Sequence, residues 1–574
     1  MTRKSGGPKT RILILSLVLI AGFLIIGIRL FFLQVVHASS LADRAEKQRQ
    51  KTIMIEGERG TIFDRKGRVL AVNLELPSVF STPGHVHNPS QTAKKLGRLL
   101  GKDPSQLKKR IKGEKSFVWI ERKMDPSLAE KVQKLDLNGI GFLMESRRFY
   151  PKRTLMSHVL GFAGVDNNGL EGLELRYDEF LKGEKGWVVL ERDALGGFVF
   201  PKDLVYAQPS RGKDIVLTLD EVIQFISDRE LDRAIEETSA KGGVVIAMDP
   251  YTGGILSLSV RPQFNPNHVG RHEPSDWRNR AITDLYEPGS TFKIVAAAAA
   301  LEEGLVSLGE PIDCENGALR VGSGFLHDHE PHGILTFEEV LQKSSNIGIF
   351  KVANRLGNQK LYQYVKAFGF GKKTDIDLNG EVAGVVHPPS QWSGRSLASM
   401  AMGQEVGVTA LQVIGSASVI ANGGWLPQPH LVSEIRDEEG NSLLNFSYPL
   451  SRRVISEKTA RSMTRILKGV VQGDGTGELA AFGGYEVAGK TGTAQKVDPS
   501  TGRYSRGKVI SSFIGFVPAD HPRVIIYVVL DEPKGVHWGG TVAAPVFKRI
   551  AEQTLSYMGV MPEGKENFLL VSQK

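Results

Sequence analysis

The sequence contains almost no cysteine, and this absence limits how its fold can be stabilised. Cys314 is the single cysteine among 574 residues, so the chain cannot form an internal disulfide. In an oxidising compartment, a chain with one cysteine cannot form a wrong internal disulfide. The sequence also shows no repeat of solenoid length and no low-complexity tract, which argues against a repeat architecture. A chain of this length is long enough for two or three domains with substantial cores.

The sequence lacks a recognisable metal site. Five potential ligands gather in one short stretch: His327, Asp328, His329, Glu330 and His332. The second ligand pair, at the spacing that a metal site needs, is missing. We therefore interpret the stretch as a polar loop that leads into a helix cap at Thr336, and we expect neither a metal nor another cofactor.

One long apolar run stands near the start of the chain. Ile12–Ile28 is interrupted only by one serine and two glycines, and the run continues past Arg29 to Val36. It is long enough to span a bilayer. Because residues 1–11 are short and basic while the remainder is long, a cytoplasmic N-terminus is favoured. No clear cleavage site follows, and no nearby cysteine offers a lipid attachment point, so we predict an uncleaved transmembrane anchor at 12–36.

Positive charge is concentrated in one segment. Residues 91–135 contain thirteen Lys/Arg and five Asp/Glu, a net charge of +8 against +9 for the whole chain. A solvated surface is the default interpretation, and a surface for an anionic membrane or protein partner is the alternative. Nucleic acid would require a cytosolic location, which the predicted anchor argues against. We therefore expect no nucleic-acid binding.

The segment Pro288–Lys293 places a serine and a lysine at the start of an apolar helix. Residues at i and i+3 share a helical face, so Lys293 is expected beside the Ser290 hydroxyl as its base. Ser290 is also expected to cap the first turn of a helix that contains Ala296–Ala300. The S-x-x-K pattern begins at four serines: Ser105, Ser210, Ser290 and Ser505. Only the third opens an apolar helix, and the others stand in polar or linker-like stretches.

A second motif follows in the chain. Ser344-Ser345-Asn346 is its only S-x-N sequence. Thr336 and Glu339 match a capping box, which predicts a helix that runs into Lys343. Ser344 and Asn346 would then lie where this helix gives way to the next, with their side chains free to point into a cleft.

A third motif follows the second. Lys490-Thr491-Gly492 is the only K-T-G sequence in the chain, and Thr493 continues it. Tyr485–Val497 is predicted to be a strand, in which Gly492 would permit the close approach of a ligand. A peptide-like substrate could lie along the edge of this strand as an added strand.

This ordered triple resembles the motif set of the penicillin-binding serine acyltransferases. Four stretches resemble the signatures of the family's non-catalytic domain: residues 59–67, 148–151, 158–161 and 169–172. The resemblance covers nearly the whole chain and points to the class B penicillin-binding proteins, the monofunctional D,D-transpeptidases of cell-wall synthesis. The S-S-N form and the sequence E-P-G-S-T-F-K look most like the division (septal, FtsI-like) branch. Elongation-type relatives usually carry an aspartate in the second motif.

The order of the expected elements gives an α+β fold class. Strands are expected early and late in the second part of the chain, with helices between them: 214–220, 243–248, 255–260, 485–497, 509–517 and 523–530. This order implies an antiparallel sheet that packs against terminal helices, beside an all-helical lobe. The family fold is similar, with its active site between sheet and lobe. We predict a stalk at 37–56, an elongated non-catalytic pedestal or dimerisation-type domain at 57–209, and a transpeptidase domain at 210–574.

The resemblance implies acyl transfer on peptidoglycan stem peptides that end in D-Ala-D-Ala. Ser290 would be the nucleophile, and Lys293 would be its base once burial and a nearby cation such as Lys490 had lowered its pKa. Ser344 would relay a proton to the leaving amine, and Asn346 would orient Lys293 and the substrate amide.

The third motif would bind the substrate. Lys490 with Thr491 and Thr493 would bind its carboxylate, beside Gly492. The backbone N–H groups of Ser290 and Thr493 would form the oxyanion hole.

The resemblance also implies partners and a location. β-Lactams should acylate Ser290 as substrate mimics. A SEDS-family glycosyltransferase and other division proteins are the expected protein partners. The chain would cross the bacterial cytoplasmic (inner) membrane once, with its N-terminus inside and its catalytic domain on the outer, periplasmic side.

Several alternatives remain beside the septal role. An elongation-type transpeptidase of the same class is the nearest. A membrane-bound β-lactamase or D,D-carboxypeptidase would pass the acyl group to water, but the chain has no E-x-x-L-N segment of the class A deacylating type. A non-catalytic β-lactam sensor would need signalling machinery across the membrane, for which we expect residues 1–11 to be too short. A division scaffold is disfavoured by the three intact motifs.

Overall fold

The computed structural model describes residues 7–113, 117–192, 198–199, 206–322, 324–446, 448, 452–498 and 500–562. It divides into two compact units whose sequences interleave. The first comprises residues 1–58, 75–146 and 183–211, and the second comprises 59–74, 147–182 and 212–574. Two stretches within the predicted pedestal, 59–74 and 147–182, pack with the larger, second unit.

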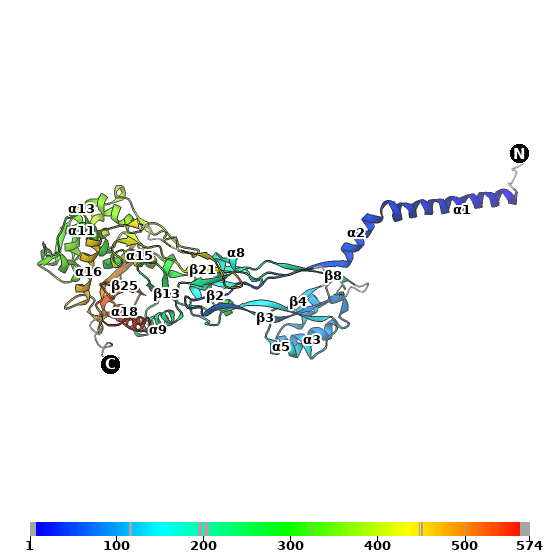
Figure 1. Ribbon diagram of the computed structural model, residues 1–574, viewed down its shortest axis with the longest axis horizontal. Coiled ribbons are helices and arrows are strands. Elements are labelled where there is room, and N and C mark those ends of the chain that lie inside the picture. Colours follow the sequence, from blue (N-terminus) through cyan, green and yellow to red (C-terminus); the bar gives the residue numbers. More distant parts are fainter. Residues whose placement is uncertain are drawn as a thin grey trace, which may run out of the picture. The chain divides into compact units, whose positions relative to one another are not determined.

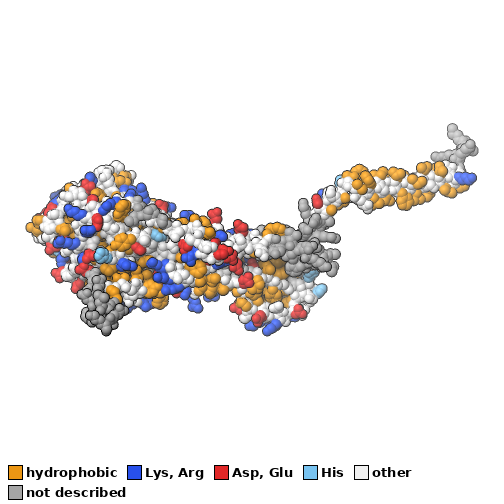
Figure 2. Space-filling view, viewed as in Figure 1, with side chains coloured by type: hydrophobic (Ala, Val, Ile, Leu, Met, Phe, Trp, Pro, Cys, Tyr) orange, Lys and Arg blue, Asp and Glu red, His pale blue; other side chains and the backbone are white. Residues whose placement is uncertain are grey.

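The first unit begins with the predicted anchor. Helix α1 (Pro8–Phe31) continues into a π-helical turn (Phe32–Val36), and together they form 29 residues with no buried side chain. At about 1.5 Å per residue this length exceeds the roughly 30 Å of a bilayer's hydrocarbon core. Apolar side chains cover its visible face (Figure 2). Among the described residues it is the one helix long and apolar enough to cross a membrane, and it fits a membrane anchor.

The predicted stalk is only partly helical. Helix α2 (Ala38–Arg49) is followed by strand β1 (Gln50–Ile55), which pairs antiparallel with β8 (Gly186–Arg192). The same unit contains a small helical layer against a sheet, formed by α3 (Pro89–Leu100), α4 (Pro104–Ile111), β4 (Val118–Glu121) and α5 (Pro126–Gln133). Strands β3 (Val69–Ser81) and β5 (Ile140–Phe149) each run from one unit into the other.

A buried ion network holds the interleaved stretches within the second unit. Arg59 is 1% exposed and forms ion pairs with Glu174 and Asp178. Arg148 Nε lies 2.6 Å from Glu174 Oε1, and its Nη1 donates to the Gly60 carbonyl at 2.6 Å. Burial raises the pKa of Glu174, but Arg148 and Arg59 outweigh it and lower that pKa overall. The stretches that begin at Arg59 and Arg148 are therefore held together by ion pairs to the same carboxylate, that of Glu174.

The centre of the second unit is a five-stranded antiparallel sheet in the order β13-β12-β26-β25-β24. Figure 1 labels β13 and β25 of this sheet. Its strands are β12 (Gly242–Met248), β13 (Ile255–Arg261), β24 (Ala488–Asp498), β25 (Arg503–Val517) and β26 (Val524–Asp531). Every residue of β12 and β13 is buried. Both strands are buried along their whole length because helices cover the two faces of the sheet.

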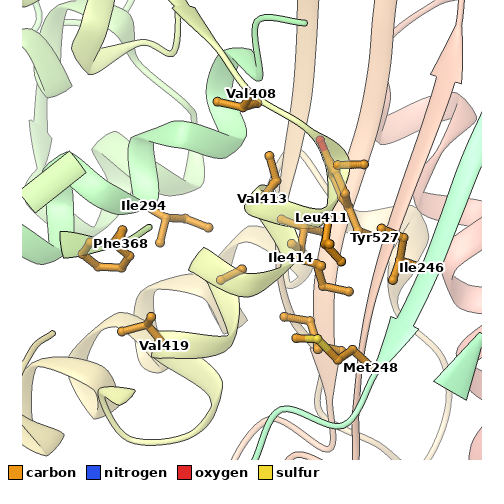
Figure 3. Packing of buried hydrophobic residues seen from close by; sticks show 14 of the residues in the cluster. Ile246, Met248, Ile294, Phe368, Val408, Leu411, Val413, Ile414, Val419 and Tyr527 are labelled. Atoms are coloured by element: carbon orange, nitrogen blue, oxygen red, sulfur yellow. The ribbon is translucent and has the colours of Figure 1, made fainter. Parts of the chain in front are cut away.

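Helices cover the two faces of this sheet. On one face, α9 (Glu221–Thr238) and α18 (Ala544–Tyr557) pack on the sheet. On the other face, α15 (Ala410–Ala421) lies against β12 and β26. Figure 3 shows Leu411 and Ile414 of α15 beside Ile246 and Tyr527 of the sheet. The predicted α+β class, with an antiparallel sheet and terminal helices, is confirmed.

Five further helices form the lobe that carries two of the motifs: α11 (Lys293–Glu302), α12 (Phe337–Gln342), α13 (Asn346–Ala367), α14 (Ser396–Ala401) and α16 (Glu457–Val471). Helix α11 is buried from Lys293 to Ala300, which its alanine-rich sequence permits because alanine adds little bulk. It packs against α13, so the first motif lies beside the second.

Candidate active site

Ser290 lies in a single turn of 3-10 helix, Gly289–Phe292, immediately before α11. The prediction that it caps this helix is wrong. Pro288 occupies the cap position and no side chain caps the turn. In a 3-10 turn the side chains at i and i+3 eclipse, so the turn keeps Ser290 and Lys293 on one face. Among the described residues, the Ser290 hydroxyl makes no hydrogen bond to the protein.

Lys293 is fully buried, and its ammonium is held by the second motif. Nζ donates to the Ser344 carbonyl at 2.5 Å, to Ser344 Oγ at 3.2 Å and to Asn346 Oδ1 at 2.7 Å. Asn346, which was expected to orient Lys293, is therefore hydrogen-bonded to it. The hydrogen bonds of Lys293 are thus made to residues more than fifty positions away, which the S-x-x-K spacing alone did not indicate.

Lys490 approaches the same hydroxyl from the sheet. It is 0% exposed, and its Nζ donates to Ser344 Oγ at 3.0 Å and to the Thr491 carbonyl at 3.3 Å. Ser344 itself adopts a left-handed backbone conformation with φ of 58°, which is uncommon for a residue with a side chain. One serine hydroxyl therefore bridges the lysines of the first and third motifs.

Burial lowers the pKa of both lysines. It lowers the pKa of Lys293 to about 7, although Asp328 opposes the shift. Burial, and then the charge of Lys293, lower the pKa of Lys490 well below its ordinary value. Lys490 was predicted to help lower the pKa of Lys293, but burial alone lowers that pKa, and the effect of charge runs from Lys293 to Lys490 instead. A lysine that is neutral near pH 7 can accept a proton.

Asp328 positions the second motif, a role that sequence reasoning missed. Its Oδ2 accepts from Ser345 Oγ at 2.6 Å, and its Oδ1 accepts from the backbone N–H groups of Asn346 and Ile347. The Asn346 side-chain amide donates to the His327 carbonyl at 2.8 Å. This carboxylate satisfies N–H groups at the start of α13.

The histidine-rich stretch differs from the predicted loop. His327 ends strand β16 (Gly324–His327), which pairs with β15 (Ala318–Val321), and only the following residues form a loop. In the part of the chain that the structure describes, no group of three potential ligands is arranged to hold a metal ion. The capping box of Thr336 and Glu339 is confirmed at the start of α12.

The third motif lies on β24, the edge strand of the sheet on the side opposite β13. Gly492 was predicted to make room for a ligand, but the structure gives it another role. A Cβ atom there would lie 2.4 Å from Ser512 Oγ and 2.9 Å from Thr291 Cγ2. The glycine therefore lets the strand pack tightly against the turn of Ser290. Thr493 Oγ1 accepts from the Gly539 N–H at 3.0 Å, which orients its hydroxyl.

This sheet and lobe, with three motifs meeting at the half-buried hydroxyl of Ser344, define a penicillin-binding transpeptidase fold. The family model described as "Penicillin binding protein transpeptidase domain" matches residues 243–552. A second, described as "Penicillin-binding Protein dimerisation domain", matches residues 54–217.

Comparisons over the whole chain agree. Stage V sporulation protein D of Bacillus subtilis is 40% identical, over 96% of this chain and 86% of that protein. Peptidoglycan D,D-transpeptidase FtsI of Escherichia coli is 31% identical, over 98% of this chain and 94% of that protein. Penicillin-binding protein 3 of Mycobacterium tuberculosis, crystallised with aztreonam, is 29% identical with a TM-score of 0.70, over 89% of this chain and 98% of that one. The chain belongs to the class B penicillin-binding proteins.

Proposed function

We propose that this protein is a serine-type peptidoglycan D,D-transpeptidase. Ser290 is its nucleophile, and its substrate is a stem peptide that ends in D-Ala-D-Ala. The observation that carries this proposal is the environment of Lys293, a buried amine with a pKa of about 7 one turn from the serine. The transpeptidase names of several relatives support the reaction class.

The first half-reaction forms an acyl-enzyme. Neutral Lys293 takes the hydroxyl proton as Ser290 Oγ attacks the carbonyl carbon of the penultimate D-alanine. The C–N bond then breaks, and the terminal D-alanine leaves as an amine that needs one proton. Ser344 Oγ contacts both lysines and can hand that proton over. Asn346 fixes Lys293 in place throughout.

The second half-reaction reverses these steps with a new amine. An amine on a neighbouring stem peptide attacks the ester carbonyl and loses its proton to the same groups, and Ser290 recovers its hydroxyl. During both steps the backbone N–H groups of Ser290 and Thr493 stabilise the oxyanion. Lys490, Thr491 and Thr493, beside Gly492, bind the substrate carboxylate, with the peptide aligned along β24.

β-Lactams are the proposed inhibitors, acylating Ser290 as substrate mimics. A relative of similar fold has been crystallised with aztreonam and also with ampicillin. The lifetime of the adduct separates a transferase from a hydrolase. We expect the penicilloyl ester to persist for many minutes, and rapid steady-state hydrolysis of nitrocefin by the purified protein would instead make it a β-lactamase.

We assign the protein to cell division, with α1 as a single membrane anchor, the N-terminus inside and the catalytic unit outside. Residues 57–209 then form a largely non-catalytic pedestal, and a SEDS-family glycosyltransferase and other division proteins are its partners. The S-S-N form of the second motif supports this branch.

A sporulation role is the second candidate, because stage V sporulation protein D is 40% identical over nearly the full chain. Depletion in the native host separates the two roles. A block in septation supports the first, whereas normal division with defective spores supports the second.

A further inference from the structure

A small cavity in the second unit takes no part in the proposed catalysis. Its volume is about 230 Å³. Sites for drug-sized molecules begin at about 300 Å³, so this cavity suits a smaller molecule. Its walls come from within residues 368–375, 412–415 and 426–429 and from Arg452, and they include no residue of the three motifs.

Apolar side chains and one glycine form the buried side of the cavity. Phe368 caps the end of α13 and is 1% exposed, and Leu426 is half-buried in β20 (Trp425–Leu426). Gly415 belongs to α15, every residue of which is buried. A Cβ atom on Gly415 would nevertheless meet nothing within 4 Å. Open space therefore lies beside this buried helix, where an apolar group can fit.

Close packing does not explain the glycine at position 415. Glycine in a helix interior costs about 1 kcal/mol relative to alanine. At Gly492 the neighbouring atoms would obstruct a Cβ atom, but at Gly415 no described atom does. Alanine would thus suit the helix better and would also fit. The feature that glycine preserves at this position is the open space of the cavity.

Three cations without ion-pair partners line the cavity. Lys372, Lys373 and Arg452 are exposed, and none of them pairs with an acid in the part of the chain that the structure describes. Arg452 Nη2 donates to the carbonyls of Lys366 and Ala367, at 2.7 Å and 2.6 Å. Because carbonyl groups carry no net charge, the positive charge of the guanidinium is not neutralised.

Lys366 shows that these positive charges lie close together. Its Nζ donates to the Gly371 carbonyl at 2.9 Å, beside the lining. Burial, and then the charges of Lys372 and Arg452, lower the pKa of Lys366. Like charges that affect each other in this way repel, and an anion placed among them would be attracted by all of them.

The balance of charge indicates what kind of anion fits. Three cations and one acid, Asp375, line the cavity, which leaves a net charge of +2. Lys366 and Glu381 lie next to the lining and carry opposite charges, and the Glu381 carboxylate already accepts three hydrogen bonds. A phosphate monoester carries about −1.5 to −2 near pH 7 and has three acceptor oxygens, whereas a carboxylate carries a single charge. The monoester therefore matches the lining better.

We propose that this cavity binds a small phosphate monoester with a compact apolar group, such as one planar ring. The phosphate contacts the three cations of the lining, and the apolar group fills the space beside Gly415 against Phe368. The inference goes beyond the proposed acyl transfer and does not depend on it.

Binding of phenyl phosphate to the detergent-solubilised full chain tests the proposal, measured by saturation-transfer NMR and by titration. Phenol, benzoate and inorganic phosphate are matched probes that lack the phosphate, its second charge or the ring. We expect saturable binding of phenyl phosphate at least about tenfold tighter than that of each matched probe. Binding should persist after penicillin treatment, because Ser290 does not line the cavity.

Variants of the lining separate charge from space. Lys372→Gln and Lys373→Gln each remove one cation and should each weaken binding about fivefold, the upper end for an exposed ion pair. Gly415→Ala places a methyl group in the open space. It should weaken binding severalfold without lowering the unfolding temperature, because alanine is the better helix former.

Lys458→Gln is the control for loss of a cation, because Lys458 is exposed on α16 and does not line the cavity. It should leave binding unchanged, and all variants should keep their penicillin labelling. Dihexanoyl phosphatidic acid should not displace phenyl phosphate, since its two acyl chains exceed the cavity. Displacement by this lipid would overturn the assignment to a compact ester.

Three further results would overturn the proposal. The first is absence of saturable binding to the wild-type chain, or equal binding of all four probes. The second is loss of binding after penicillin treatment, which would place the probe at the active site. The third is unchanged binding in the folded Lys372→Gln, Lys373→Gln and Gly415→Ala variants.

Discussion

Lys293 Nζ lies 2.7 Å from Asn346 Oδ1, and this contact joins the first motif to the second. The amide oxygen carries no net charge. It therefore positions the Lys293 amine without raising the pKa that burial has lowered. A carboxylate in the same place would favour the protonated form of Lys293. The choice of asparagine is therefore consistent with a lysine that must be neutral to act.

Asn346→Asp should raise the pKa of Lys293 and slow acylation at neutral pH. The loss should be smaller at higher pH, where the amine again loses its proton. Asn346→Ala removes the hydrogen bond without adding charge. The acylation rate of this variant should therefore fall, and the loss should not become smaller at higher pH. The second-order rate of labelling by a fluorescent penicillin, measured across pH for both variants, checks this expectation. Identical pH profiles for the two variants would contradict it.

The wild-type acylation rate should rise with pH through about 7. Burial lowers the pKa of Lys293 to about 7 from an ordinary value of 10.5, so the neutral, basic form is gained as pH increases through that point. Lys293→Arg stays protonated and should lose at least roughly a thousandfold in rate, as for loss of a member of a catalytic unit. A wild-type rate that does not change between pH 5.5 and about 8.5 would contradict the assignment of the base.

Asp328→Ala should damage acylation without removing any group that touches the substrate. The carboxylate binds Ser345 and the backbone at the start of α13, and loss of such a cap costs about 0.5–2 kcal/mol of unfolding free energy. A misplaced second motif should slow acylation by up to about a hundredfold. Thermal unfolding and labelling rates measure the two effects, and Asp313→Ala, at the end of strand β14 (Pro311–Asp313), is a control for loss of an acid.

Gly492→Ala should destabilise the contact between β24 and the turn of Ser290. The added Cβ would meet Ser512 Oγ and Thr291 Cγ2, and overpacking of this kind costs about 1–3 kcal/mol. Ser512→Ala removes one of the two obstacles, so the double variant should recover part of the lost unfolding free energy and labelling rate. Equal stability of the single variant and the wild type would show that the strand has room at this position.

Replacement of α1 by an unrelated single-span helix tests whether the anchor also contacts a partner. Gly22 and Gly27 offer open surface on α1, where small residues permit close helix approach. The chimera should keep its penicillin labelling but fail to support septation in a strain depleted of the native protein. Full complementation would reduce α1 to a tether and leave the pedestal as the candidate for partner contacts.

Local sequence patterns predicted the elements well where the signal lies within a few residues. The capping box at Thr336, the strands at 243–248 and 255–260, and the long apolar helix near the start of the chain all appear as expected. The pairing of Lys293 with Ser344 was not visible in S-x-x-K spacing, because it depends on α11 packing against α13. Gly492 was misread for the same reason, since its neighbours Ser512 and Thr291 come from other elements.

Domain boundaries were harder to predict because each unit is built from several separate stretches of the sequence. The buried network of Arg59, Arg148 and Glu174 ties stretches over a hundred residues apart into the second unit. Nothing in the composition of either stretch marks that association. Asp328 was considered only as a metal ligand, since its contact with the start of α13 requires the folded loop.

The central claim is that Ser290 is the nucleophile activated by Lys293. Labelled penicillin should modify the purified full chain once, and peptide mass spectrometry should place the adduct on Ser290. Ser290→Ala should keep the unfolding temperature of the wild type and lose the adduct. An adduct on another residue, or stoichiometric labelling of the folded Ser290→Ala variant, would contradict the account.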